Sequence, residues 1–180
     1  MSSPSRPAGK LAARDLAELG LMSALMVTAQ FALSWIPNVH LTAVLTVVTA
    51  VTVGWSALCA VGVYVLVEGL MYGFGVWWFA YLYAWPLLCV AAVLLRRVGP
   101  PPLLWAAVTG AHGLLFGAMC ALPYVFISGF PAAAAYWVSG IPFDLIHCAS
   151  NFMLTLVLIK PLIAAAQKLY ARGRPLEAEQ

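Results

Sequence analysis

The sequence predicts an all-α integral membrane protein, a bundle of six transmembrane helices with both termini in the cytoplasm. Of its 180 residues, 64% are hydrophobic and 8% are charged, whereas a soluble domain has about 45–50% apolar and about 25% charged residues. A hydrocarbon core about 30 Å thick needs about 20 mostly apolar residues per helical crossing. The apolar stretch from Leu16 to Ala166 therefore has room for six or seven crossings.

The positions of the basic residues favour the even number. All nine Lys and Arg lie near the N-terminus, at Arg96 and Arg97, or from Lys160 onward. With six crossings, these residues fall on one side of the membrane and the other side has none. Because basic loops stay in the cytoplasm, we expect both termini inside the cell, in a multi-pass protein of the plasma membrane. The basic residues thus indicate topology and not a surface that binds nucleic acid.

The chain is expected to form one membrane domain over residues 15–166, between a mobile cytoplasmic tail, 1–14, and a cytoplasmic C-terminal tail, 167–180. No internal repeat is evident, so an inverted-repeat transporter is not favoured. The four cysteines lie in four different apolar segments without a C-x-x-C pair. They are expected to be small buried hydrophobes, and we expect neither a metal site nor a cofactor.

Breaks in the apolar pattern place the helices. The first helix runs from Asp15 to about Ile36, where Pro37 and Asn38 interrupt it. Glycines, prolines and the two arginines bound the others, which are expected at about residues 40–53, 57–72, 76–95, 103–127 and 142–163. The second helix is short for a crossing, so either it is little tilted or protein covers its ends.

The last connection contains several glycines and prolines. It is expected to span residues 128–141, with Pro142 at the first position of the sixth helix, where proline is favoured. Asp144, His147 and Asn151 then follow at spacings of three and four residues, which puts them on one face of that helix. This polar stripe favours a surface that faces a ligand. Alternatively, Asp144 complements the positive N-terminus of the helix.

Other polar and aromatic residues lie in segments where charge is strongly disfavoured. Glu68 shares a helix face with Tyr72; the alternative is an intramembrane pair with a histidine or a tyrosine hydroxyl. Tyr81 and Trp85 lie deeper than an interfacial aromatic belt and either line a pocket or pack. His112 is interpreted as a packing histidine.

Most of these residues map to the outer half of the six-helix arrangement. Few polar groups among aromatic walls are typical of a small-molecule pocket, and aromatic rings favour a ring-containing ligand. The predicted substrate-binding residues are Asn38, His40, Glu68, Tyr72, Tyr81, Trp85, Asp144, His147 and Asn151.

The first helix carries a ridge of small residues at every fourth position, Gly20, Ala24, Thr28 and Ala32. In lipid, such a ridge lets another helix approach closely. The spacing leaves open whether that helix belongs to this chain or to another subunit.

Several of these features together resemble a known family, the substrate-binding S components of energy-coupling factor (ECF) vitamin transporters. They are the six helices, the small-residue ridge, the turn at residues 36–40 (IPNVH) and the stretch at residues 141–147 (IPFDLIH). The resemblance covers residues 16–166. It implies capture of a vitamin or similar compound from outside.

The resemblance also implies partners, namely a transmembrane coupling protein and two cytoplasmic ATPases. The ridge, which reads Ala24-x-x-x-Thr28 in place of the family's A-x-x-x-A, would dock the coupling protein. Because the chain has no Walker A motif, ATP use belongs to the partners. Two alternatives are a membrane scaffold or assembly factor and an embedded enzyme using Asp144, His147 and Glu68. The sequence lacks H-E-x-x-H and G-x-S-x-G, which disfavours the enzyme.

Overall fold

The computed structural model describes residues 13–171. These residues form six α-helices and two short 3-10 helices, without a strand. The α-helices are α1 (Ala13–Leu33), α2 (Thr42–Val53), α3 (Ala57–Tyr72), α4 (Val76–Leu95), α5 (Pro102–Ser128) and α6 (Phe130–Ala171), and the 3-10 helices are η1 (Gly54–Ser56) and η2 (Arg96–Val98). Residues 1–12 and 172–180 of the predicted tails lie outside the described residues.

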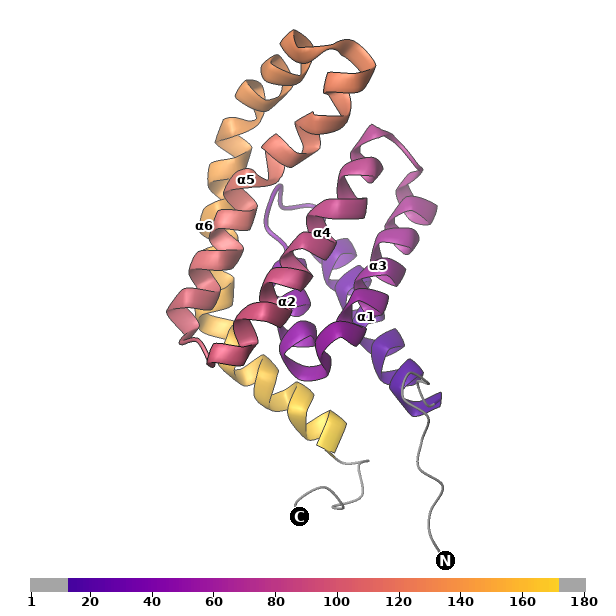
Figure 1. The fold of residues 1–180 in the computed structure, drawn as a ribbon, viewed down its shortest axis with the longest axis vertical. Coiled ribbons are helices and arrows are strands. Elements are labelled where there is room, and N and C mark those ends of the chain that lie inside the picture. Colours follow the sequence, from indigo (N-terminus) through magenta and orange to yellow (C-terminus); the bar gives the residue numbers. More distant parts are fainter. Residues whose placement is uncertain (1–12, 172–180) are drawn as a thin grey trace, which may run out of the picture.

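Five helical stretches are long and apolar enough to cross a membrane. The predicted helical membrane protein is thus confirmed at this level. Helices α2 and α3, with η1 between them, count as one stretch of 31 residues, Thr42–Tyr72. Figure 1 shows the chain reversing direction at η1, so that α2 and α3 run side by side in opposite senses. The six separate crossings stay a prediction.

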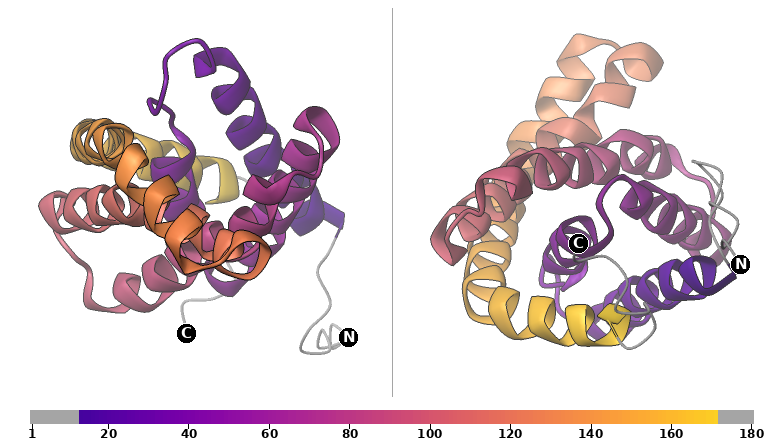
Figure 2. Two further views of the ribbon diagram at one scale, coloured as in Figure 1. Left: turned by 90° about the horizontal axis from the view of Figure 1, so that it is seen from above. Right: turned by 60° about the horizontal axis from the view of Figure 1, so that its bottom comes forward.

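Helix α2 occupies the centre of the bundle. Each of its residues from Thr42 to Ala50 is buried, and it contacts α1, α3, α4, α5 and α6. The right-hand view of Figure 2 shows the other helices around it. Two of its threonines donate their hydroxyls to carbonyls of their own helix, Thr49 to Leu45 and Thr52 to Val48, each at 2.7 Å. A helix surrounded by protein does not need to be long enough to cross the membrane. This was one of the two explanations that the sequence left open for its short length.

Arg96, directly after the end of α4, caps the C-terminal end of α2. The last carbonyls of a helix have no partner within it, and the Arg96 guanidinium donates to those of Ala50 and Val51, at 3.2 and 3.0 Å. Gly54, with φ +67°, lets the arginine come close, because a Cβ there would lie 2.7 Å from Arg96 Nη2. This contact joins the ends of α2 and α4.

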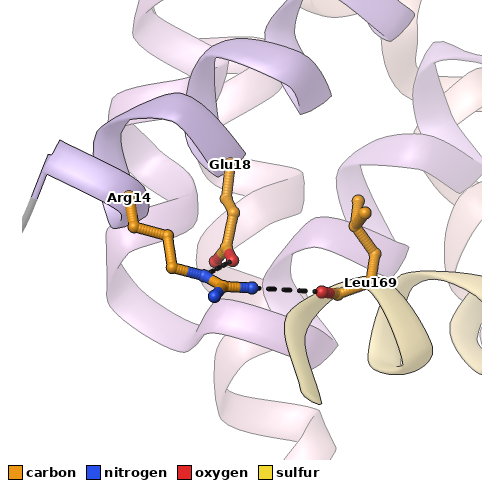
Figure 3. A network of polar contacts seen from close by, with 3 residues as sticks. All are labelled: Arg14, Glu18 and Leu169. Atoms are coloured by element: carbon orange, nitrogen blue, oxygen red, sulfur yellow. Dashed lines mark hydrogen bonds and ion pairs between the residues drawn. The ribbon is translucent and has the colours of Figure 1, made fainter. Parts of the chain in front are cut away.

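The start of α1, η1, η2 and the end of α6 lie at one end of the molecule (Figure 1). There Arg14 forms an ion pair with Glu18 (2.7 Å) and donates to the carbonyl of Leu169 at 3.5 Å (Figure 3). We call this the basic end; it also carries Arg96 and Arg97. The opposite end, the pocket end, carries the 34–41 loop between α1 and α2.

The predicted 128–141 connection is wrong. Helix α5 ends at Ser128 and α6 begins at Phe130, so Gly129, with φ +83°, is the whole connection. Pro142 lies well inside α6, not at its start. Membrane helices tolerate an interior proline when neighbouring groups satisfy the backbone carbonyl that loses its hydrogen bond. Pro142 was therefore not a reliable sign of where the sixth helix begins. Asp144 consequently has no helix N-terminus to complement, and that alternative is excluded.

Helix α5 contains an example of this compensation. Pro123 has no N–H, so the carbonyl of Met119 lacks its usual partner four residues on. The hydroxyl of Tyr83 in α4 donates to that carbonyl instead. Beyond this point α5 and α6 continue as a long hairpin (Figure 1, top). Since α6 has 42 residues, it is about 63 Å long at about 1.5 Å per residue, twice the thickness of a hydrocarbon core.

Candidate functional site

A pocket of about 280 Å³ lies at the pocket end, between the 34–41 loop, the end of α1, the end of α3 and the first turns of α4. Five of the nine predicted substrate-binding residues line it: Asn38, His40, Glu68, Tyr72 and Tyr81. They come from three separate segments of the chain. The other four, Trp85, Asp144, His147 and Asn151, do not line it.

The 34–41 loop is fixed to α6 on its inner side. Asn38 has φ +57°, a left-handed conformation in which asparagine is enriched. Its carbonyl accepts a hydrogen bond from Ser150 Oγ at 2.8 Å. Two residues on, the His40 ring packs edge-on against His147, with centroids 4.5 Å apart. These contacts hold one wall of the pocket in place.

Glu68 supplies the carboxylate of the pocket. The residue is 3% exposed, and its Oε1 has no hydrogen-bond donor among the described residues. No ion pair joins it to a Lys, Arg or His within residues 13–171. The pairing with a histidine that the sequence left open is therefore not observed. Tyr72, one turn further along α3, is half exposed at the rim.

Aromatic side chains of α4 form the facing wall. The rings of Trp77 and Tyr81 meet edge-on at 5.0 Å, and Tyr81 meets Trp85 at 5.9 Å. Trp85 is 1% exposed and lies beneath the pocket. Of the two alternatives for these residues, Tyr81 lines the pocket and Trp85 packs under it.

His112, which the sequence interpretation left out, belongs to the ring cluster under the pocket. Its centroid lies 5.4 Å from that of Trp85, and the nearby Phe116 ring lies 5.0 Å from His147. Its Nε2 lies 3.0 Å from the carbonyl oxygen of Ala84, so it packs with a polar partner, as expected. In the sequence, His112 could have been recognised in the same way as the other candidate residues, as an ionisable group in an apolar helix.

Asp144 and Asn151 join α6 to α5 and do not face the pocket. Asp144 Oδ1 accepts from the backbone N–H of Gly117 at 2.9 Å. Asn151 Nδ2 donates to the carbonyl of Thr109 at 3.3 Å, and Thr109 is also hydrogen-bonded to Thr155 at 2.9 Å. The polar stripe of α6 is thus divided: its two ends bind α5, while His147 in the middle contacts the pocket loop.

Glycines of α5 make this close helix packing possible. A Cβ at Gly113 would lie 2.8 Å from the backbone of His147. One at Gly110 would lie 3.2 Å from Cβ of Phe152. Small residues at such contacts are how helices associate closely in lipid. The α5/α6 pair is therefore held by packing as well as by hydrogen bonds.

No known protein family, curated protein or solved structure matches this chain. Among residues 13–171, no three His, Cys, Asp or Glu lie close enough together to hold a metal ion. What the site offers is one carboxylate, one histidine and several aromatic rings around a pocket of small-molecule size.

The small-residue ridge of α1 faces away from the chain's other helices. All four of its residues, Gly20, Ala24, Thr28 and Ala32, are exposed, and a Cβ at Gly20 would meet nothing within 4 Å. The opposite face packs inward, where Ser23 Oγ donates to the Ala60 carbonyl of α3 at 2.9 Å. Of the two alternatives for the ridge, packing against another helix of residues 13–171 is excluded.

Replacing Gly113 with alanine should destabilise the bundle, because the methyl group would press on the backbone of His147. Overpacking of this kind costs about 1–3 kcal/mol. Gly140→Ala in α6 is the matched control, since a Cβ there meets nothing within 4 Å. Thermal unfolding of the purified protein should show a lower Tm for Gly113→Ala and an unchanged or higher Tm for Gly140→Ala. Equal Tm values would contradict the close packing.

Proposed function

We propose that this chain is the substrate-capture membrane subunit of an ECF-type ABC importer. It binds a vitamin or a similar small ring-containing micronutrient from outside the cell and delivers it to the cytoplasm together with ATPase partners. The observation that carries the proposal is the pocket at the end opposite the basic end, where a carboxylate and aromatic rings surround a space of about 280 Å³. Pockets of this composition bind small organic molecules.

The distribution of charge supports the orientation. Arg14, Arg96 and Arg97 lie at the basic end, and basic groups near membrane helices remain in the cytoplasm. The proposal therefore places both termini in the cytoplasm and the mouth of the pocket outside, in the plasma membrane. Capture from the outside needs this arrangement.

The ridge of α1 supports a partner within the membrane. Helices associate in lipid through close packing of small residues, since no hydrophobic force drives apolar helices together there. The proposed partner is a transmembrane coupling protein that packs on Gly20, Ala24, Thr28 and Ala32. Two cytoplasmic ATPases supply the energy, because the chain itself has no Walker A motif.

Binding, not catalysis, is the proposed role of the pocket. Ser34, a hydroxyl on its wall, donates to the carbonyl of Phe31 at 2.8 Å. A serine nucleophile needs a general base within hydrogen-bonding distance, and Ser34 has no such bond to a carboxylate or an imidazole within residues 13–171. The 34–41 loop is held to α6 by Ser150 and His147, and these contacts are proposed to break when substrate enters or leaves.

Purified protein should retain its substrate, which mass spectrometry of the extracted small molecules would identify. Leu33 lines the pocket, so Leu33→Trp should fill part of it and remove the compound. Leu21→Trp makes the same change at an exposed position of α1 and should leave the compound bound. The proposal fails if no compound is retained after expression in rich medium, or if Leu33→Trp retains as much as the wild type.

Ala24→Trp should prevent docking of the coupling protein while leaving substrate binding nearly unchanged. The indole would hold the partner helix away from the ridge, yet Ala24 is exposed and does not line the pocket. Co-purification of the partner subunits and substrate retention should be measured on the same sample. The exposed Ala111 of α5 gives the control, Ala111→Trp, which should keep both. If the partner remains bound to Ala24→Trp, the ridge is not the docking surface.

A further inference from the structure

We propose that the compound held in this pocket is an organic cation, a ring-bearing molecule whose positive charge lies against the Glu68 carboxylate and the aromatic rings beside it. This inference rests on the proposed function, because it assumes that the pocket binds a small molecule. It goes further by assigning the charge of that molecule, which the sequence leaves open.

The charge of the pocket wall favours a cationic ligand. Glu68 is the one acid among the residues that line the pocket, and no Lys or Arg lines it. The arginines within the described residues lie at the basic end, at the far ends of α1 and α4. A carboxylate that is 3% exposed, with Oε1 lacking a donor, is strongly disfavoured in its charged form without a positive partner. Among residues 13–171 no Lys, Arg or His forms an ion pair with it, so a cationic ligand is the partner that would stabilise the charged carboxylate.

The aromatic rings of the pocket wall favour a cationic ligand as well. Tyr72, Trp77 and Tyr81 line the same pocket as Glu68. The faces of aromatic rings carry negative potential and attract cations whose centres lie within about 6 Å, most strongly when water is excluded. A carboxylate combined with tryptophan and tyrosine rings is a standard means of holding quaternary or protonated nitrogen. The carboxylate and the aromatic rings of the wall thus both favour a positively charged ligand.

Other ligand charges fit this wall less well. An anion would lie beside the Glu68 carboxylate without a basic group to balance either charge. A neutral molecule with an N–H group would satisfy Oε1 but leave the negative charge uncompensated. His40 is the other ionisable group besides the tyrosines on the wall. Its ring packs against His147 and Trp85, and it forms no ion pair with Glu68.

The size of the pocket limits the ligand further. At about 280 Å³, it is just below the usual range for drug-sized ligands of about 300–1,000 Å³. A compound with one or two rings and a single charged nitrogen fits this space. A long or multiply charged molecule does not.

Three probes with one ring and different charges test the inference: benzylammonium, benzyl alcohol and benzoate. Binding to the full-length protein in lipid nanodiscs can be followed by tryptophan fluorescence, because Trp77 lines the pocket. Benzylammonium should bind at least about tenfold more tightly than benzyl alcohol, the difference expected for a charge-assisted contact. Benzoate should bind more weakly than either. Equal binding of the three probes, or no binding of benzylammonium, overturns the inference.

Glu68→Gln removes the charge but keeps the shape of the side chain. It should lower the affinity for benzylammonium at least about tenfold and change that for benzyl alcohol much less. Glu18→Gln is the control, since Glu18 is an acid at the basic end paired with Arg14. It should keep the preference of the wild type. A Glu68→Gln protein that still prefers the cation overturns the role of Glu68.

This inference and the proposed function fail in different ways. If mass spectrometry identifies a neutral or anionic compound that Leu33→Trp loses, capture by this pocket stands and the cation is wrong. If benzylammonium shows the predicted preference but no compound is retained from the cell, the charge of the site stands and capture is wrong. The ranking of the three probes on the wild type requires no variant, so it is informative even if Glu68→Gln does not fold.

Discussion

Helix α2 has 12 residues, about 18 Å at about 1.5 Å per residue, and a hydrocarbon core is about 30 Å thick. Such a helix would leave unpaired backbone groups in lipid unless protein covered it. The other five α-helices enclose it, and Arg96 caps its C-terminal carbonyls. Its N-terminal end then lies well inside the bundle at the pocket end. The preceding 34–41 loop must enter the bundle to reach it, which is how Asn38 and His40 come to line a pocket.

The scarcity of water in the bilayer also divides the buried polar groups into two sets. Asp144, Asn151 and Thr109 are used between α5 and α6, where each has a hydrogen-bond partner. Asp144 Oδ2 and Asn151 Oδ1 have no partner among the described residues, nor do Glu68 Oε1 and His40 Nδ1, but only Glu68 and His40 line the pocket. Groups of the first kind hold helices together, whereas those of the second kind are suited to a ligand. Both sets look alike in the sequence, because each consists of polar residues in apolar helices.

These physical constraints explain which features of the fold and of the site could be predicted from the sequence. The apolar segments and four of the five helix connections were predictable, since the arginines, glycines and prolines around them end helices. The 128–141 connection was not, because its glycines and prolines resemble helix ends, whereas α6 begins at Phe130 and continues through Pro142. Tyr83, far away in sequence, shows at Pro123 that the packing of another helix can satisfy a carbonyl freed by an interior proline. Five of the nine predicted site residues line one pocket, and their role in substrate binding stays a prediction. The partners of Asp144 depend on helix packing at Gly117, which spacing along one helix does not specify.

The central claim is that the pocket opens to the outside of the cell while the basic end faces the cytoplasm. Single cysteines introduced as Ser34→Cys at the pocket and Arg97→Cys at the basic end, in a protein without the four native cysteines, would test it directly. Both positions are exposed. On intact cells, an impermeant maleimide should modify the cysteine at position 34 and should reach that at position 97 only after the membrane is opened. Modification at position 97 on intact cells, with position 34 protected, would contradict the account.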